Sequence, residues 1–180
     1  MARWVEPQKV NIPPDLLLAT DGDEMIAEVL LRRGIASPAE ARGFLNPDEY
    51  APSPAAALPD MDAALERIEE ALQRRQRIGI WGDFDADGVT STALLLETLR
   101  DLGAQVDFYI PDRLSESHGV HVPSLQRLIS RGIRLLLTCD TGTTDHPALN
   151  YARGQGVDVI VTDHHDLGEE PPRATAFLNP

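Results

Sequence analysis

The fold of this chain is decided by residues 78–88, which read IGIWGDFDADG. The first four of these residues have the apolar character of a buried strand, and three aspartates follow between Gly82 and Gly88. A helical pattern begins near Val89, so the stretch predicts a strand, a turn and a helix. In an open α/β sheet, ligands bind at the carboxyl ends of the strands. The acidic turn is therefore the first candidate for a functional site.

Strand and helix patterns alternate from this stretch to the end of the chain. Short apolar runs predict strands at residues 77–82, 105–110, 134–139, 157–162 and 174–178. Helices are expected between them, at about 89–102, 122–131 and 144–155. This alternation predicts right-handed crossovers and an α/β fold, with a mostly parallel β-sheet flanked by helices. Because almost nothing follows the last predicted strand, we expect a domain that is truncated at its C-terminus.

The residues before the sheet predict a small helical N-terminal lead-in over 1–59, and the sheet domain is expected to span 60–180. Ser37-Pro38-Ala39-Glu40 has the cap, the first-turn proline and the acid that start a helix. The apolar spacing predicts helices at 23–34, 37–45 and 60–75. Prolines and alanines at 50–59 predict an extended connector.

Composition narrows the class of protein. The chain has 180 residues, a net charge of −13 and a single cysteine, Cys139. One cysteine allows no internal disulfide and suits a reducing cytoplasm, which is the expected location. The start of the chain lacks a signal-peptide pattern, and no apolar run reaches the ~18 residues of a membrane span, so we expect no membrane partner. The negative charge argues against nucleic-acid binding, unless cations bound among clustered acids reverse the local sign.

Two further strand ends repeat the acidic pattern. Asp140 follows the strand predicted at 134–139, and Asp163-His164-His165 follows the strand predicted at 157–162. Because adjacent side chains of an extended segment point in opposite directions, we expect one imidazole to bind a metal while the other faces substrate. The aspartates of the first turn and Asp140 each have a simpler interpretation as a helix cap, and Asp163 can support its own turn, but the three motifs together favour a metal site.

The candidate ligands are carboxylates and imidazoles, without a thiolate. Such a set suits Mn²⁺ or Mg²⁺ better than structural zinc, and Zn²⁺, Fe²⁺ and Co²⁺ stay open. Two ions ~3.5–4 Å apart would activate water for a phosphoester displacement, and Asp140 can bridge them if the motif strands are neighbours. Arg113 either binds the phosphate or lies at the surface. The same two alternatives, phosphate contact and exposure to solvent, apply to His118 and His121.

In their order along the chain, these motifs resemble the RecJ-like single-stranded-DNA-specific exonucleases of the DHH phosphoesterase superfamily, in their N-terminal catalytic part. The matching stretches are residues 82–88, 111–113, 139–142 and 159–165, with shorter matches at 33–35, 44–45 and 177–180. The resemblance implies that metal is bound by Asp85, Asp87, Asp140 and His164, with two Mn²⁺ or Mg²⁺ ions in the complete protein. It also implies that His165 contacts the scissile phosphate and that Asp163 supports the histidines.

The implied activity is 5′-to-3′ hydrolysis of single-stranded DNA in DNA repair and recombination, with a single-strand-binding protein and a helicase as partners. The chain departs from the family at Trp81, where some members have a histidine ligand, and at residues 116–119, which read ESHG where many members read EGYG. It also ends before the family's further metal-binding aspartate and C-terminal domain. We therefore expect weak metal binding and little or no nuclease activity from this fragment alone.

Two other functions compete with this interpretation. One is a phosphatase of the same superfamily that acts on short oligonucleotides, cyclic dinucleotides or pyrophosphate, and a series of substrate lengths would distinguish it. The other is a non-catalytic relative that keeps the fold as a protein-interaction or DNA-binding module. Such a relative should have lost its ligands, whereas every motif residue is present: Asp85, Asp87, Asp140, Asp163, His164 and His165.

Overall fold

The computed structural model describes residues 5–180, which divide into two compact units, one ending at Ser53 and one spanning Pro54–Pro180. Residues 1–4 belong to the predicted lead-in and to the start that lacks a signal-peptide pattern, and they lie outside the described residues. Within the described part, no helix combines the length and the apolar character that crossing a membrane requires.

The described part of the first unit contains three short α-helices, α1 (Pro14–Ala19), α2 (Glu24–Arg32) and α3 (Pro38–Leu45), followed by one 3₁₀ turn, η1 (Pro47–Glu49). Side-chain caps set the starts of α2 and α3: the Asp23 carboxylate accepts two backbone N–H groups of α2, and Ser37 forms the predicted capping box with Glu40. The buried residues of the three α-helices form one small core, made of Leu16, Ala27, Leu30 and Ala41. The sequence does not predict α1, because six residues are too few to show a helical period.

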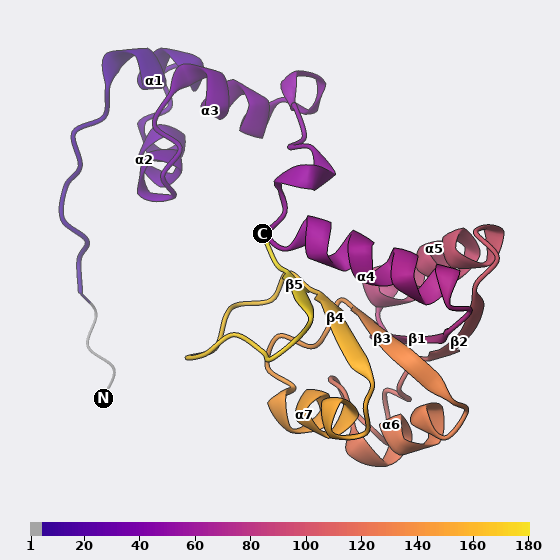
Figure 1. The fold of residues 1–180 in the computed structure, drawn as a ribbon. Helices are drawn as coiled ribbons and strands as arrows, with labels where there is room; N and C mark the ends of the chain where they lie inside the picture. The colour runs from indigo at the N-terminus through magenta and orange to yellow at the C-terminus, as the bar shows by residue number, and fades with distance from the viewer. Residues whose placement is uncertain (1–4) are drawn as a thin grey trace. The chain divides into compact units, whose positions relative to one another are not determined.

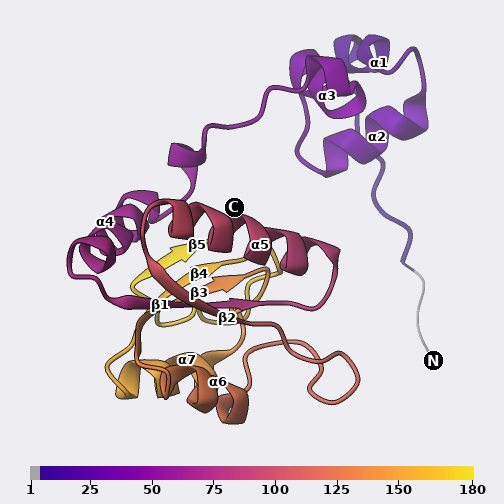
Figure 2. The same ribbon diagram turned by 90° about the vertical axis from the view of Figure 1, so that its right-hand side faces the viewer.

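The second unit is a parallel sheet between two layers of helices (Figures 1 and 2). Its strands are β1 (Arg77–Gly82), β2 (Gln105–Tyr109), β3 (Ile133–Cys139), β4 (Asp158–Thr162) and β5 (Ala176–Leu178). They lie in the order β2-β1-β3-β4-β5, and every pairing is parallel. The predicted α/β fold with a mostly parallel sheet is therefore confirmed.

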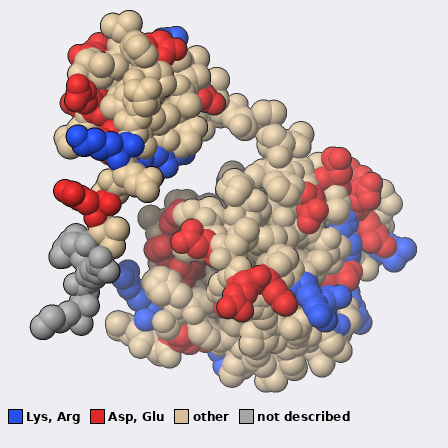
Figure 3. Space-filling model, turned by 90° about the vertical axis from the view of Figure 1, so that its left-hand side faces the viewer, with Lys and Arg blue, Asp and Glu red and all other residues tan. Residues whose placement is uncertain are grey.

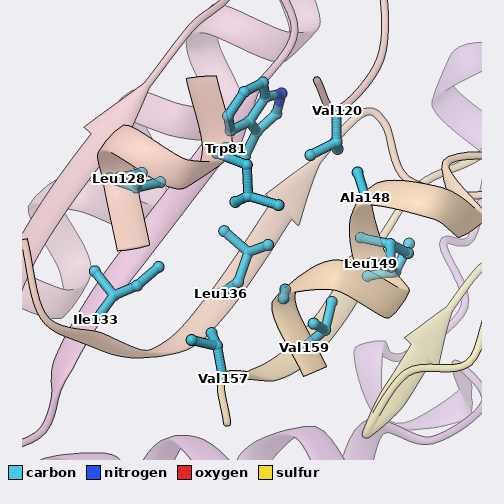
Figure 4. Packing of buried hydrophobic residues seen from close by; sticks show 12 residues of the cluster. Trp81, Val120, Leu128, Ile133, Leu136, Ala148, Leu149, Val157 and Val159 are labelled. Atoms are coloured by element: carbon cyan, nitrogen blue, oxygen red, sulfur yellow. The ribbon is translucent and has the colours of Figure 1, made fainter. Parts of the chain in front are cut away.

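Helices α4 (Met61–Gln73) and α5 (Ala86–Asp101) lie on one face of the sheet, and α6 (Val122–Ile129) and α7 (His146–Gly154) lie on the other (Figure 2). Figure 4 shows Trp81, Leu136 and Val159 from neighbouring strands packed with residues of α6 and α7. A second buried cluster, which includes Ile80 and Leu137, packs toward α4 and α5. Burial on both faces explains why these strands read as continuous apolar runs. The connector predicted as extended contains one 3₁₀ turn, η2 (Ala55–Ala57).

The register of the sheet aligns the three acidic motifs. Gly82 pairs with Cys139, and Cys139 pairs with Thr162, at the carboxyl ends of β1, β3 and β4. The next residue after each of these strands is an aspartate, and the three leave the sheet side by side: Asp83, Asp140 and Asp163. The chain adds β2 on one side of β1 and β3 on the other. Such a reversal opens a crevice at the carboxyl edge of the sheet, where ligands bind.

Candidate metal centre

Asp140 lies at the middle of the candidate site, between the motifs that follow β1 and β4. Its backbone is left-handed, with φ of 60°, and its side chain is only 6% exposed. Neither carboxylate oxygen accepts a hydrogen bond from the described residues. His164 Nε2 lies 3.0 Å from Asp140 Oδ1, without the geometry of a hydrogen bond. A buried carboxylate that accepts no hydrogen bond is unfavourable, and a bound cation would satisfy it.

The turn after β1 brings Asp85 and Asp87 to the same place. Asp85 Oδ1 accepts the Gly88 N–H at 3.2 Å and caps α5, so the capping interpretation holds for this residue. Asp87 lies in the first turn of α5, with Oδ2 3.8 Å from His164 Nε2. The turn needs a glycine at position 88, because a Cβ there would lie 2.6 Å from the backbone oxygen of Asp83.

Two groups of possible ligands meet at Asp140. Ligand atoms of Asp83, Asp85 and Asp140 lie within 4.8 Å of one another, and so do those of Asp140, His164 and His165. Burial, and then the negative charges of Asp87 and Asp85, raise the pKa of Asp140 to about 6. A divalent cation would remove this repulsion. The orphaned oxygens and the set of oxygen and nitrogen donors without a thiolate both fit Mn²⁺ or Mg²⁺.

The carboxylate of Asp163 holds the motif after β4 together. Its Oδ1 accepts the backbone N–H groups of His164 and His165 and lies 2.7 Å from His165 Nδ1. Its Oδ2 accepts the Thr143 N–H at 3.0 Å. Burial acts to raise the pKa of Asp163, but the hydrogen bonds from Thr143 and His165 bring it below its usual value. The bond to Asp163 in turn raises the pKa of His165. Both oxygens are therefore engaged in positioning neighbours.

The sequence predicts that the side chains of His164 and His165 point in opposite directions, and this prediction is wrong. Their ring centroids lie 4.9 Å apart, and both imidazoles offer an atom to the group around Asp140. The alternation of side chains applies to strands, but β4 ends at Thr162. The two histidines lie in a turn in which Asp163 accepts both of their N–H groups, and this turn brings the rings to the same side.

Two cavities border the candidate ligands. One, of about 350 Å³, is lined by polar residues that include Asp140, Asp163 and His165. The other, of about 470 Å³, is lined by Asp87 and His164 together with apolar residues: Leu58, Met61, Leu178 and Pro180. Arg113 lines neither of them. Its guanidinium carbon lies 5.2 Å from the centroid of the Phe84 ring, so it lies beside the acidic turn and outside the ligand group.

Two residues at this edge, Asp83 and Asn179, have partners that the sequence does not indicate. The sequence indicates Asp83 only as one of three clustered acids. In the structure its Oδ2 lies 2.8 Å from His118 Nδ1. Asn179, part of the closing match at 177–180, donates to the backbone oxygen of His165 at 3.0 Å. These contacts join residues distant in sequence, so no local pattern reveals them. The number of acids in the turn is the one available signal for Asp83.

Comparison with known proteins links this geometry to a family. The model of the DHH family, N-terminal domain, matches residues 77–180. The single-stranded-DNA-specific exonuclease RecJ of Bacillus subtilis is 41% identical over 159 residues, covering 87% of this chain and 20% of that protein. RecJ of Thermus thermophilus is 43% identical over 133 residues, covering 73% of this chain and 20% of that protein. The chain thus spans about a fifth of the length of these relatives.

Two solved structures share the fold. The crystal structure of an exonuclease RecJ bound to manganese matches with a TM-score of 0.66 and 40% identity, over 72% of this chain and 33% of that one. RecJ of Thermus thermophilus in complex with Mn²⁺ matches with a TM-score of 0.63 and 31% identity, over 95% of this chain and 24% of that one.

Proposed function

This chain belongs to the DHH family, and from that premise we propose that it carries the metal site of an exonuclease that hydrolyses phosphodiester bonds of single-stranded DNA. The observation that carries the proposal is the buried carboxylate of Asp140, which lacks hydrogen bonds where three motifs meet. The similar proteins are single-stranded-DNA-specific exonucleases, and the two matching structures hold manganese. We therefore propose Mn²⁺ or Mg²⁺, with two ions in the complete protein.

Each candidate residue has a role in this proposal. Metal would be held by Asp85, Asp87, Asp140 and His164, and when bound it supplies an activated water and neutralises phosphate oxygens. His165 presents Nε2 to the scissile phosphate, because its Nδ1 is engaged by Asp163. Arg113 forms no ion pair with the described residues and offers a cation to the substrate backbone.

The distribution of charged side chains supports the proposal that a nucleic-acid substrate is attracted mainly by bound metal ions. The net charge is −13, and the face in Figure 3 shows acidic side chains in several separate patches without a continuous basic surface. Bound cations would reverse the sign at the carboxyl edge of the sheet. The 5′-to-3′ direction, a role in DNA repair and recombination in the cytoplasm, and partnership with a single-strand-binding protein and a helicase belong to the same proposal and rest on the family resemblance.

Calorimetric titration with Mn²⁺ tests the metal site. We expect binding by the wild-type chain and its loss in the double variant Asp140→Ala, His164→Ala. Asp101→Asn is the matched control, because Asp101 is an exposed acid at the far end of α5, and it should bind Mn²⁺ as the wild type does. Equal Mn²⁺ binding by the double variant would contradict the proposal.

Substrate length and strandedness test the activity. In the complete protein with Mn²⁺, we expect stepwise release of mononucleotides from long single-stranded DNA and little hydrolysis of the matching duplex. Blocking the 5′ end should stop the release, whereas blocking the 3′ end should not. A protein that hydrolyses only dinucleotides, cyclic dinucleotides or pyrophosphate would instead be the phosphatase considered above.

A further inference from the structure

A second pair of carboxylate and imidazole borders the same cavity as Asp163 and His165. The cavity of about 350 Å³ is lined by residues 140–145, by Asp163 and His165, and also by Asp83 and His118. Because β3 lies between β1 and β4, the two pairs flank the residues that follow β3. The volume is at the lower end of the ~300–1,000 Å³ of ligand pockets.

The two pairs have the same geometry. His118 Nδ1 lies 2.8 Å from Asp83 Oδ2, and His165 Nδ1 lies 2.7 Å from Asp163 Oδ1. Both carboxylates are buried, with side chains 3% and 2% exposed. The other oxygen of Asp83 accepts the Phe84 N–H, and the Phe84 ring lies 4.2 Å from the His118 ring, centroid to centroid. In each pair the imidazole is anchored through Nδ1, so Nε2 is the atom it can offer to a ligand.

The backbone around His118 is fixed even though its side chain is 65% exposed. Its neighbours Ser117 and Gly119 are both left-handed, with φ of 66° and 93°. Trp81 Nε1 donates to the Gly119 carbonyl at 3.2 Å, and a Cβ on Gly119 would lie 2.7 Å from Asp145 Oδ1. A non-glycine residue in this conformation persists only where its surroundings enforce it, and such residues gather at functional sites.

The position of His118 suits a substrate contact better than a metal contact. His118 belongs to neither of the described groups whose ligand atoms lie within 4.8 Å of one another. The cavity is also acidic, because its lining includes four carboxylates: Asp83, Asp140, Asp145 and Asp163. These negative charges line the cavity in which a phosphate would bind, and they repel it. The described lining contains no lysine or arginine, so the two imidazoles are the side chains in it that can carry a positive charge and oppose this repulsion.

We propose that His118 is a substrate-binding residue whose imidazolium form donates Nδ1–H to Asp83 and Nε2–H to a phosphate oxygen of the nucleic-acid strand, with Asp83 as the residue that positions the ring. This inference rests on the proposed function, since it assigns a contact to the same phosphate-processing site. A phosphate bound there would be held from the β1 flank by His118 and from the β4 flank by His165.

Nitrogen NMR of the imidazoles tests this contact with thymidine 5′-monophosphate as the probe. The chain, labelled with ¹⁵N-histidine and saturated with Mg²⁺, is titrated with the nucleotide, and His118→Gln assigns the resonances of His118. We expect the Nε2 signals of His118 and His165 to shift, while those of His121 and His146 stay unchanged. His118→Gln should weaken nucleotide binding roughly tenfold, as loss of a hydrogen bond to a charged group does.

Matched variants separate the possible results. His146→Gln, at the start of α7 and outside the cavity lining, should bind the nucleotide with wild-type affinity. Asp83→Asn should change the Nδ1 signal of His118 before nucleotide is added and should also reduce the shift of its Nε2 signal during the titration, whereas an Asp83 that does not position the ring would leave this response to nucleotide unchanged. If His165 responds and His118 does not, or if His118→Gln binds like the wild type, the inference is wrong and the proposed function stands. If neither histidine responds, both are wrong.

Discussion

The buried charged residues at the two ends of the sheet differ in their hydrogen bonding. At the amino-terminal end, Arg67 of α4 donates to Asp158 at 2.7 Å, to Gln76 at 2.8 Å and to the backbone oxygen of Arg134, and one nitrogen is left without a partner. At the carboxyl end, Asp140 is as deeply buried, but neither of its oxygens accepts a hydrogen bond from the described residues. Buried charge that is hydrogen-bonded holds elements together, whereas a buried carboxylate at a crevice that accepts no hydrogen bond is available to a ligand.

Of the substitutions that test this comparison, Asp140→Asn should have the largest effect. Asp140 belongs to both ligand groups, so we expect Mn²⁺ affinity to fall by at least ~100-fold, about 2.7 kcal/mol. Metal-free Asp140→Asn should nevertheless be more stable than the wild type, by about 1 kcal/mol, because a repelled carboxylate is gone. Calorimetry and urea unfolding measure the two effects.

The sign of the stability effect depends on pH. The folded-state pKa of Asp140 is raised from 3.8 to about 6, so its ionisation destabilises the metal-free protein fully above about pH 6. The destabilisation fades as pH falls from 6 toward 3.8, where the unfolded chain also becomes protonated. The advantage of Asp140→Asn should therefore be present at pH 7.5 and shrink by pH 4.5. An advantage that grew on acidification would contradict the assigned cause.

Arg67→Ala, at the amino-terminal end of the sheet, should lower stability and leave metal binding unchanged, which is the opposite of the effects expected for Asp140→Asn. It removes the bonds that tie α4 to β3 and β4, and we expect the free energy of unfolding to fall by about 2 kcal/mol. This is less than for a fully buried pair, because Asp158 is 54% exposed and water can solvate it. Urea unfolding measures the loss. Mn²⁺ affinity should not change, and a parallel loss of metal binding would show that the two ends are coupled.

The contrast between the two ends was only partly accessible from sequence. Apolar periods place the strands, and the aspartates that follow β1, β3 and β4 lie at strand ends where the topology of parallel sheets brings them together. The proximity of Asp85, Asp140 and His164 can therefore be predicted from the local sequence patterns together with the rule that parallel strands end at the same edge of a sheet. That Asp140 would have no hydrogen bonds does not follow, because it depends on every neighbour in the folded site.

Contacts between distant loops were beyond reach for a physical reason. Asp83 meets His118 across 35 positions of sequence, and the meeting depends on left-handed backbone at Ser117 and Gly119. Ser117 has no side-chain property that predicts this conformation. The paired rings of His164 and His165 were likewise inaccessible, since alternation predicts side-chain direction in strands and these residues lie in a turn.

Asp163→Asn should sharpen the comparison by weakening the site without removing a ligand. The neutral amide loses the charge that holds the Thr143 N–H and His165 Nδ1, so His164 and His165 become less well positioned. We expect Mn²⁺ affinity to fall roughly tenfold, since residues that orient ligands contribute about 10- to 100-fold. Calorimetry beside Asp140→Asn checks the order. A larger loss in Asp163→Asn would mean that Asp163 is itself a ligand.

Glu116→Gln tests whether pairing, rather than location at the carboxyl edge, decides how a carboxylate behaves. Glu116 follows β2, and its oxygens accept from the Ser124 and Tyr109 hydroxyls and from the Asp112 N–H. Hydrogen bonds from Ser124 and Tyr109 lower the pKa of Glu116 from 4.5 to about 2, opposite to the shift of Asp140. Its stabilisation is therefore complete above about pH 4.5 and is lost as pH falls toward 2.

We expect Glu116→Gln to lower the free energy of unfolding by about 1 kcal/mol at pH 6, the usual net contribution of a hydrogen bond, and by less at pH 3. Glu97→Gln, an exposed acid on α5, is the control and should change stability little at either pH. Urea unfolding at the two pH values measures the difference. A deficit that persists unchanged at pH 3 would mean that the network acts through packing alone. The opposite shifts of Glu116 and Asp140 would then need a cause other than the presence or absence of hydrogen-bond donors.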